Sequence, residues 1–209
     1  MIATGFITNG AKVYITGRDA PACHAAVGDL QELDECQALA ASLARLEPGG
    51  LHVLFNNAGA AWGADLDSHP DAAWTKLLTL SLQPAARLHP DAAVPAAARE
   101  GRQPGRPARV VHVGSIDGLH HLSRHIARDL GSRNVTTNVL ACGRFRTRMM
   151  KAALDAAEDV LTENIPLRRI GRDEDVAGSA VFWRARLGEV MFFLYHLVVS
   201  FFPSFRTNM

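Results

Sequence analysis

Short apolar or β-branched runs alternate along the chain with longer segments of helical periodicity. Runs bounded by turn residues predict strands, and these lie at Lys12–Thr16, Leu51–Phe55, Val110–Val113 and Val135–Leu140. Apolar residues at helical spacing predict helices at Leu33–Leu46, Trp74–Leu82, Leu119–Leu130, Met149–Leu161 and Glu174–Arg186. Because strands that alternate with helices imply parallel crossovers, we expect an α/β fold with a doubly wound parallel sheet.

Residues that favour helix ends stand at several predicted boundaries. Asp71 precedes one helix as an N-cap candidate, Gly131 follows another, and Asp173 places negative charge at the start of the last helix. Pro84 would lie inside the Trp74–Leu82 helix if that helix continued, at a cost of roughly 3 kcal/mol. We therefore expect a break or a kink near Pro84.

The composition limits the classes of protein to which the chain can belong. The chain has 209 residues, of which 48% are hydrophobic and 21% are charged, and this excludes a chain that is disordered throughout. With 22 basic and 21 acidic residues the formal net charge is +1, which gives no reason to expect a nucleic-acid partner. Three cysteines without a CxxC motif and no secretory signal predict a cytoplasmic protein without a zinc site.

The apolar residues are unevenly placed, since five of the nine phenylalanines fall in the last 20 residues. The run Val190–Phe202 is interrupted only by His196 and Ser200. It is shorter than the ~20 residues that a membrane-spanning helix needs, so we expect no membrane span. An uncharged run of this kind is more typical of an aggregation-prone segment than of a functional one.

Polar and small residues follow three of the predicted strands. Asn57 and Gly59, in the sequence NNAG, come directly after LHVLF, and such residues let a ligand approach the backbone at the end of a parallel strand. The same residue types are common in strand-to-helix turns, so that interpretation stays open. Ser115 follows the next strand, and Thr147 follows the one after it.

Taken in that order, NNAG, GSIDG and ACGRFRT resemble the successive strand-end motifs of the short-chain dehydrogenase/reductase family. The segments GRDAPAC, HHLSRHIARDLG and IPLRRIGRDEDVA are most similar to its 3-oxoacyl-acyl-carrier-protein reductases. The resemblance implies a Rossmann-like domain over residues 1–186 and a divergent apolar tail over 187–209. It also implies NADP-dependent reduction of a small-molecule carbonyl substrate.

The resemblance assigns roles to individual residues. It implies that Ser115 is the catalytic hydroxyl that hydrogen-bonds the substrate carbonyl, and that Asn57 and Gly59 lie beside the cofactor. It further implies that Thr147 reaches the pyrophosphate or carboxamide side of the nicotinamide nucleotide. A serine in a GSIDG sequence is also a common turn residue, and no metal site is implied.

Two further residues would meet the adenosine half of the cofactor. Asp29, in GDLQ, would match the family's adenine-contacting aspartate. Arg18 follows the strand KVYIT, where a cation would neutralise a 2′-phosphate and so favour NADP over NAD. An arginine after a strand is also commonly a solvated side chain.

The chain departs from the family pattern in its phosphate loop and its edge strand. The family's first strand and the loop TGxxxGxG have no counterpart, because the sequence opens in the part that matches the following helix. The strands KVYIT and LHVLF must therefore pair directly or leave a gap. Too few residues separate Arg18 from the remnant strand near Val27 for a full crossover, so we expect that edge strand to be weak or lost.

A second departure concerns the proton donor. The family uses Tyr-x-x-x-Lys, but the only tyrosines here are Tyr14 and Tyr195, and neither follows the Ser115 strand. Ser81 stands where the family carries its active-site Asn, and Cys142 stands where Pro is usual. General acid catalysis contributes about 10²- to 10⁴-fold, so we expect no meaningful turnover.

These departures leave three interpretations open. The chain is a 3-oxoacyl-type reductase with impaired activity, or it is a non-catalytic relative that acts as a binding or hetero-oligomer partner of an intact reductase. The chain itself could form a homo- or hetero-oligomer. The third interpretation is a truncated, internally deleted product of a defective gene.

Overall fold

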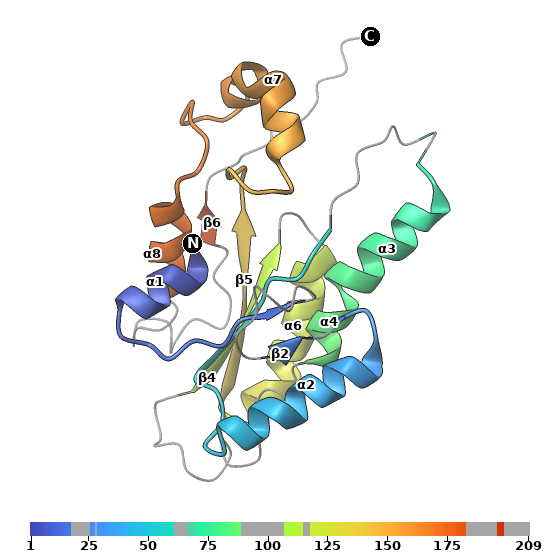
Figure 1. Ribbon diagram of the computed structural model, residues 1–209, viewed down its shortest axis with the longest axis vertical. Helices are drawn as coiled ribbons and strands as arrows, with labels where there is room; N and C mark the ends of the chain where they lie inside the picture. The colour runs from blue at the N-terminus through green and yellow to red at the C-terminus, as the bar shows by residue number, and fades with distance from the viewer. Residues whose placement is uncertain are drawn as a thin grey trace.

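The computed structural model describes residues 1–17, 26–27, 29–60, 67, 69–88, 107–114, 118–182 and 196–198. Helices and strands alternate along these residues (Figure 1). In chain order they are α1 (Ile2–Thr8), β1 (Thr16–Gly17), β2 (Ala26–Val27), α2 (Leu33–Leu46), β3 (Val53–Asn56), α3 (Asp71–Ser81), α4 (Gln83–Arg87), β4 (Ala108–Gly114), α6 (Gly118–Gly131), β5 (Val135–Cys142), α7 (Lys151–Glu163), α8 (Asp173–Phe182) and β6 (His196–Val198).

The strands form two separate parallel sheets. One has two strands in the order β1-β2, and the other has four in the order β3-β4-β5-β6. The ladder between β4 and β5 is the longest of the described pairs and runs from Ala108 opposite Val135 to Gly114 opposite Ala141. A parallel sheet with helical crossovers confirms the predicted α/β, Rossmann-like fold.

Helices cover both faces of the four-stranded sheet. In Figure 1, α1 and α8 lie on one side of the strands, and α2, α3, α4 and α6 lie on the other. On the α6 side, Val110 and Val135 pack with Ile126 and Leu130. On the opposite side, Val111 and Leu140 pack with Phe145 and Val176, and the first residues of α1 join this cluster. The two layers confirm a doubly wound arrangement.

Pairing decides which predicted strands form. The strand β4 extends its prediction by two residues at its start and one at its end, β5 extends its prediction by two residues at its end, and α2 has its predicted bounds. The prediction of a strand over Lys12–Thr16 is wrong for all but its last residue. In that segment the side chains of Lys12 and Tyr14 bind Glu47 at the end of α2, at 2.6 and 2.7 Å. The apolar pattern favours a strand, but only Thr16 and Gly17 have a ladder partner among the described residues.

The proline-induced break is confirmed. The helix α3 ends at Ser81, and α4 begins at Gln83 with Pro84 in its first turn, where proline is tolerated. The N-cap prediction is wrong by one position, because Pro70 is the N-cap and Asp71 is the first helical residue. The last described helix begins at Asp173, one residue before its predicted start at Glu174, with the predicted acidic residues in its first turn.

The remaining expectations concern the sheet centre and the chain end. The strands β1 and β3 lie in different sheets, so they do not pair directly, and the alternative of a gap between them is the one observed. The edge strand expected to be weak is β2, which has only two residues. Residues 183–195 and 199–209 lie outside the described residues, so the boundary at 186/187 stays a prediction. Within the part of the chain that the structure describes, no helix is both long enough and apolar enough to span a membrane.

Candidate functional site

The candidate site lies at the carboxyl ends of β3, β4 and β5. Parallel strands end at the same edge of a sheet, and crevices at this edge are where open α/β sheets bind ligands. Asn57 and Gly59 follow β3, Gly114 closes β4, and Cys142 closes β5. The sheet therefore brings the carboxyl ends of β3, β4 and β5 to one edge.

A partly buried polar pair fixes the end of β3. Asn56, the last residue of β3, lies opposite His112 in the ladder with β4, and its Nδ2 is 3.2 Å from His112 Nδ1. His112 is fully buried, as expected from its position in a strand. Because this hydrogen bond lies directly before Asn57, it anchors the segment that enters the candidate site.

Ser81 holds the same segment from the helical side. The backbone N–H of Ala60 donates to Ser81 Oγ at 3.5 Å, so the end of α3 is tied to the loop after β3. A Cβ added at Gly59 would have Ser81 Oγ as its nearest neighbour, at 3.8 Å, which is an ordinary contact. Gly59 therefore presents open backbone, which suits the close approach of a ligand.

Thr147 organises the turn after β5. Its N–H donates to the carbonyl of Phe145 at 2.8 Å, and its Oγ1 accepts the N–H of Met150 at 3.3 Å. Phe145 is buried and forms an isolated parallel bridge with Gly171, which ties this turn to the segment before α8. Thr147 is thus held at the same edge of the sheet as Asn57.

Of the other predicted site residues, Asp29 is the one that the structure describes. Asp29 lies between β2 and α2, where its carboxylate accepts the N–H of Gln31 at 3.1 Å and the Nε2 of the same residue at 3.2 Å. Arg18 and Ser115 fall outside the described residues, so their predicted roles stay predictions. Asn57 and Gly59 follow the end of β3, and Thr147 follows the end of β5, so their predicted roles at this edge stay predictions.

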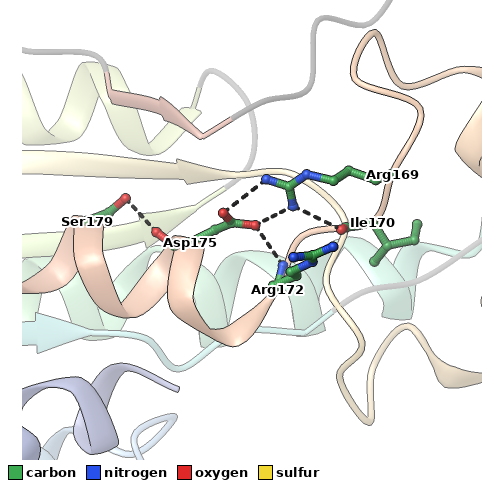
Figure 2. A network of polar contacts seen from close by, with 5 residues as sticks. All are labelled: Arg169, Ile170, Arg172, Asp175 and Ser179. Atoms are coloured by element: carbon green, nitrogen blue, oxygen red, sulfur yellow. Dashed lines mark hydrogen bonds and ion pairs between the residues drawn. The ribbon is translucent and has the colours of Figure 1, made fainter.

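Two features were missed by sequence reasoning. The first is the Asn56–His112 pair, which only the register between β3 and β4 reveals. The second is the ion pair between Arg169 and Asp175, whose atoms are 2.6 and 3.1 Å apart (Figure 2). Asp175 also accepts the N–H of Arg172 at 2.8 Å, and these contacts lower its carboxyl pKa to about 2. The repeated basic and acidic residues of RRIGRDED were the available signal.

The thiol at the end of β5 is uncharged. Burial raises the pKa of the Cys142 thiol to about 11, so this side chain is uncharged at neutral pH. Among the described residues, no three His, Cys, Asp or Glu side chains are placed to hold a metal ion. The geometry suits an organic ligand that is held by backbone groups and uncharged side chains.

The chain is similar to known reductases. The sequence pattern of the family described as enoyl-(acyl carrier protein) reductase matches residues 1–189. The rhamnolipids biosynthesis 3-oxoacyl-(acyl-carrier-protein) reductase of Pseudomonas aeruginosa is 32% identical in an alignment that is 227 residues long. The alignment covers 91% of this chain and 86% of that protein. A second relative, the 3-oxoacyl-(acyl-carrier-protein) reductase FabG of Vibrio harveyi, is 28% identical over 65% of this chain and 60% of its own length.

Solved structures share the fold. The complex of Pseudomonas aeruginosa RhlG with NADP in its active site superposes with a TM-score of 0.82 at 30% identity, covering 91% of this chain and 86% of that one. A gluconate 5-dehydrogenase from Burkholderia cenocepacia has a TM-score of 0.79 at 21% identity over 91% and 84% of the two chains. The family match extends over residues 1–189, and the Pseudomonas aeruginosa reductase is 32% identical over 91% of this chain. The chain therefore belongs to the short-chain dehydrogenase/reductase family.

Proposed function

We propose that the chain carries an NADP-dependent, 3-oxoacyl-type carbonyl-reducing site whose turnover is impaired. The observation that carries this proposal is the position of its tyrosines. Of the residues assigned to the cofactor, Asn57, Gly59 and Thr147 follow strand ends at one edge of the sheet and form what we call the retained cofactor side, although the family's phosphate loop has no counterpart. Neither Tyr14 nor Tyr195 directly follows the Ser115 strand in the sequence, where the family carries its proton donor.

The retained side fits a nicotinamide nucleotide. Asn57 follows a strand end fixed by the Asn56–His112 hydrogen bond, and Gly59 presents open backbone beside Ser81. Thr147 is fixed in its turn by bonds to Phe145 and Met150, on the same edge. A bound NADPH supplies a hydride to the substrate carbonyl carbon. The similarity to RhlG, whose structure contains NADP, supports the choice of this cofactor.

The proton-donating side does not fit the family's chemistry. The hydroxyl of Tyr14 donates to Glu47 Oε1 at 2.7 Å, and Glu47 caps the end of α2, before β3 begins. Asn57 follows the opposite end of β3, so Tyr14 is remote from the site. The helix α6, which follows Ser115 in the sequence, contains no tyrosine and no lysine. A ketone at this edge therefore lacks the Tyr/Lys donor that the family uses.

The alignment supports a loss inside the chain. The alignment with the Pseudomonas aeruginosa reductase is 227 residues long, which exceeds the 209 residues of this chain. That relative therefore has residues with no counterpart here. The short sequence between Ser115 and α6 agrees with such a loss, because it leaves no room for a Tyr-x-x-x-Lys turn ahead of HHLSRHIARDL.

The test measures binding and turnover separately. The purified full chain is titrated with NADPH by calorimetry and then mixed with NADPH and acetoacetyl-coenzyme A. We expect saturable binding of NADPH and no cofactor oxidation above the rate without protein. Sustained oxidation would contradict impaired turnover, and absence of binding would contradict the retained cofactor side.

A matched pair of glycine variants tests the location. Gly59→Val fills the open approach beside Ser81, so we expect it to weaken NADPH binding. Gly49→Val is the control, because a Cβ at Gly49 meets nothing within 4 Å and lies in the turn between α2 and β3. Equal NADPH affinity in the two variants would place the cofactor elsewhere.

A second candidate function is that of a non-catalytic partner in an oligomer. Trp74 and Leu78 lie one turn apart on α3 and are each 48% exposed. Large apolar side chains that share one exposed helix face are typical of protein–protein contacts, and tryptophan is enriched among residues that dominate binding energy. By resemblance, the equivalent family helix takes part in dimer contacts.

This candidate is tested by association. We expect the chain to co-purify with an intact 3-oxoacyl-acyl-carrier-protein reductase when the two are co-expressed, and we expect the Trp74→Ala/Leu78→Ala double variant to lose that association. Elution of the wild-type chain as an isolated monomer at micromolar concentration, with no reductase bound, would count against the partner role.

A further inference from the structure

One pair of polar side chains joins the carboxyl ends of β3 and β4. Asn56 is the last residue of β3 and lies opposite His112 in the parallel ladder, so the two side chains project from the same face of the sheet. The Nδ2 atom of Asn56 is 3.2 Å from the Nδ1 atom of His112. The ring of His112 is 0% exposed, whereas Asn56 is partly buried. The strand end is therefore bonded to a group in the protein interior.

Apolar side chains surround this pair on the same face of the sheet. Two residues earlier on each strand, Leu54 and Val110 lie opposite each other and pack in the core cluster with α6. On its other side, His112 lies opposite the buried Val139 of β5. In such surroundings a hydrogen bond is stronger than in water, and a donor that loses its acceptor costs more free energy.

The amide defines the role of the imidazole. An amide nitrogen donates hydrogen bonds and does not accept them, so Nδ1 of His112 is the acceptor in this contact. A neutral imidazole that accepts at Nδ1 carries its proton on Nε2. An apolar side chain of similar length at position 112 would leave the amide of Asn56 without this acceptor.

Two anchors hold residues 57–59, which we call the β3 loop. The Asn56–His112 contact precedes the loop, and the N–H of Ala60 donates to Ser81 Oγ at 3.5 Å directly after it. The second anchor is longer than a typical hydrogen bond and is the weaker of the two. The conformation of the β3 loop therefore depends mainly on His112.

We propose that His112 is a positioning residue, whose Nδ1 atom acts through Asn56 to hold the β3 loop in one conformation for the cofactor. The inference rests on the proposed function where it names the cofactor, whereas the effect on the loop concerns the chain alone. A ring that merely filled space in the core would not need an acceptor at Nδ1. The proposal therefore makes the acceptor, and not the volume of the side chain, the decisive property.

The first test compares two substitutions of nearly equal size. In His112→Asn the side-chain oxygen is attached to Cγ as Nδ1 is, whereas His112→Leu has a methyl group at that position. The backbone of residues 57–59 is followed by ¹⁵N relaxation without cofactor. We expect order parameters of about 0.85 in the wild type and in His112→Asn, and below about 0.6 in His112→Leu. Equal values in the two variants, or a mobile loop in the wild type, would overturn the proposal.

The second test removes the donor. Asn56→Leu changes the partly buried side of the pair, so it decides the question even if His112→Leu does not fold. We expect it to lower the order parameters of the β3 loop as His112→Leu does, and His112→Asn should not restore them in the double variant. A rigid loop in Asn56→Leu would contradict the role of the pair.

Calorimetric titration with NADPH gives the functional readout. We expect affinity to fall about tenfold in His112→Leu and to stay within about twofold of the wild type in His112→Asn, since loss of one buried hydrogen bond is an effect of this size. Equal affinities in these two variants would overturn the positioning role. If the wild type itself binds no NADPH, the proposed function fails, and the order parameters alone decide whether His112 holds the loop.

Discussion

The strands β4 and β5 are buried more completely than the strands β1 and β3. Val111 and Leu140, on β4 and β5, are completely buried, whereas each residue of β1 and β3 is partly exposed. The sequences LHVLF and VVHV are similarly apolar, so side-chain type does not produce the contrast. In a parallel sheet, a strand becomes fully buried only when neighbours pair with both of its edges and helices cover both faces.

The largest expected effect comes from the same substitution in the two regions. Leu140→Ala removes a fully buried side chain from the cluster with Val111 and Phe145, and we expect a loss of ~2–5 kcal/mol of unfolding free energy. Leu54→Ala should cost less, since Leu54 is only half-buried on β3. Urea unfolding followed by circular dichroism gives both values. Equal losses would show that the two regions are covered alike.

A pair of glycine substitutions probes the helices over the well-covered sheet. A Cβ at Gly5 would lie 2.9 Å from the Cβ of Ala177, so Gly5→Ala forces α1 away from α8, and we expect a loss of about 1–3 kcal/mol. Gly178→Ala, one position along α8, meets nothing within 4 Å and should gain up to about 1 kcal/mol from helix propensity. Thermal unfolding distinguishes the two signs. Stabilisation by Gly5→Ala would mean that the two helices are not in close contact.

A smaller effect is expected from the ion pair before α8. The pKa of Asp175 is lowered from its ordinary 3.8 to about 2, chiefly by Arg169 and also by the N–H of Arg172. A lowered carboxyl pKa stabilises the fold fully above pH 3.8, and the contribution is lost as the pH falls toward 2. Asp175→Asn should therefore lower stability by no more than about 1 kcal/mol at pH 7, and the difference from wild type should vanish near pH 2. A constant difference from pH 7 to pH 2 would contradict the assignment.

The smallest effect concerns thiol reactivity at the end of β5. With a pKa of about 11, Cys142 has about a hundredfold less thiolate at pH 8 than a thiol of the ordinary pKa 9. We expect iodoacetamide to modify Cys142 correspondingly slowly in the folded chain, as measured by peptide mass spectrometry. The urea-unfolded chain is the control. The same rate in both states would show that the end of β5 is open to solvent.

The sequence was informative wherever local pattern decides the structure. The spacing of Leu33, Leu39, Leu43 and Leu46 gave α2 its bounds, and Pro84 gave the break between α3 and α4. The positions of Asn57 and Thr147 at one edge were also predictable, because strand ends in a parallel sheet share that edge. The run KVYIT was misleading, because a strand pattern in the sequence does not show whether a neighbouring strand is present to pair with it.

Contacts between segments that are far apart in the chain could not be predicted from the sequence. The pairing of Asn56 with His112 depends on the register of two strands that are far apart in the chain, and no local pattern encodes that register. The same holds for the bonds that Lys12 and Tyr14 make with Glu47 across the end of α2. Residue identity suggested which side chains carry chemistry, and the sheet register decided which of them meet.

The connection through α6 has a consequence for the order of folding. The strands β4 and β5 are joined by one helical crossover, α6, so the residues that pair in their seven-residue ladder are near each other in the chain. The strand β6 reaches β5 only after α7 and α8 and pairs over three residues. Because closing a long loop costs entropy before any contact is made, the β4–α6–β5 unit should form first and β6 should dock last. The amides of Val111 and Leu140 should accordingly be among the slowest to exchange with solvent.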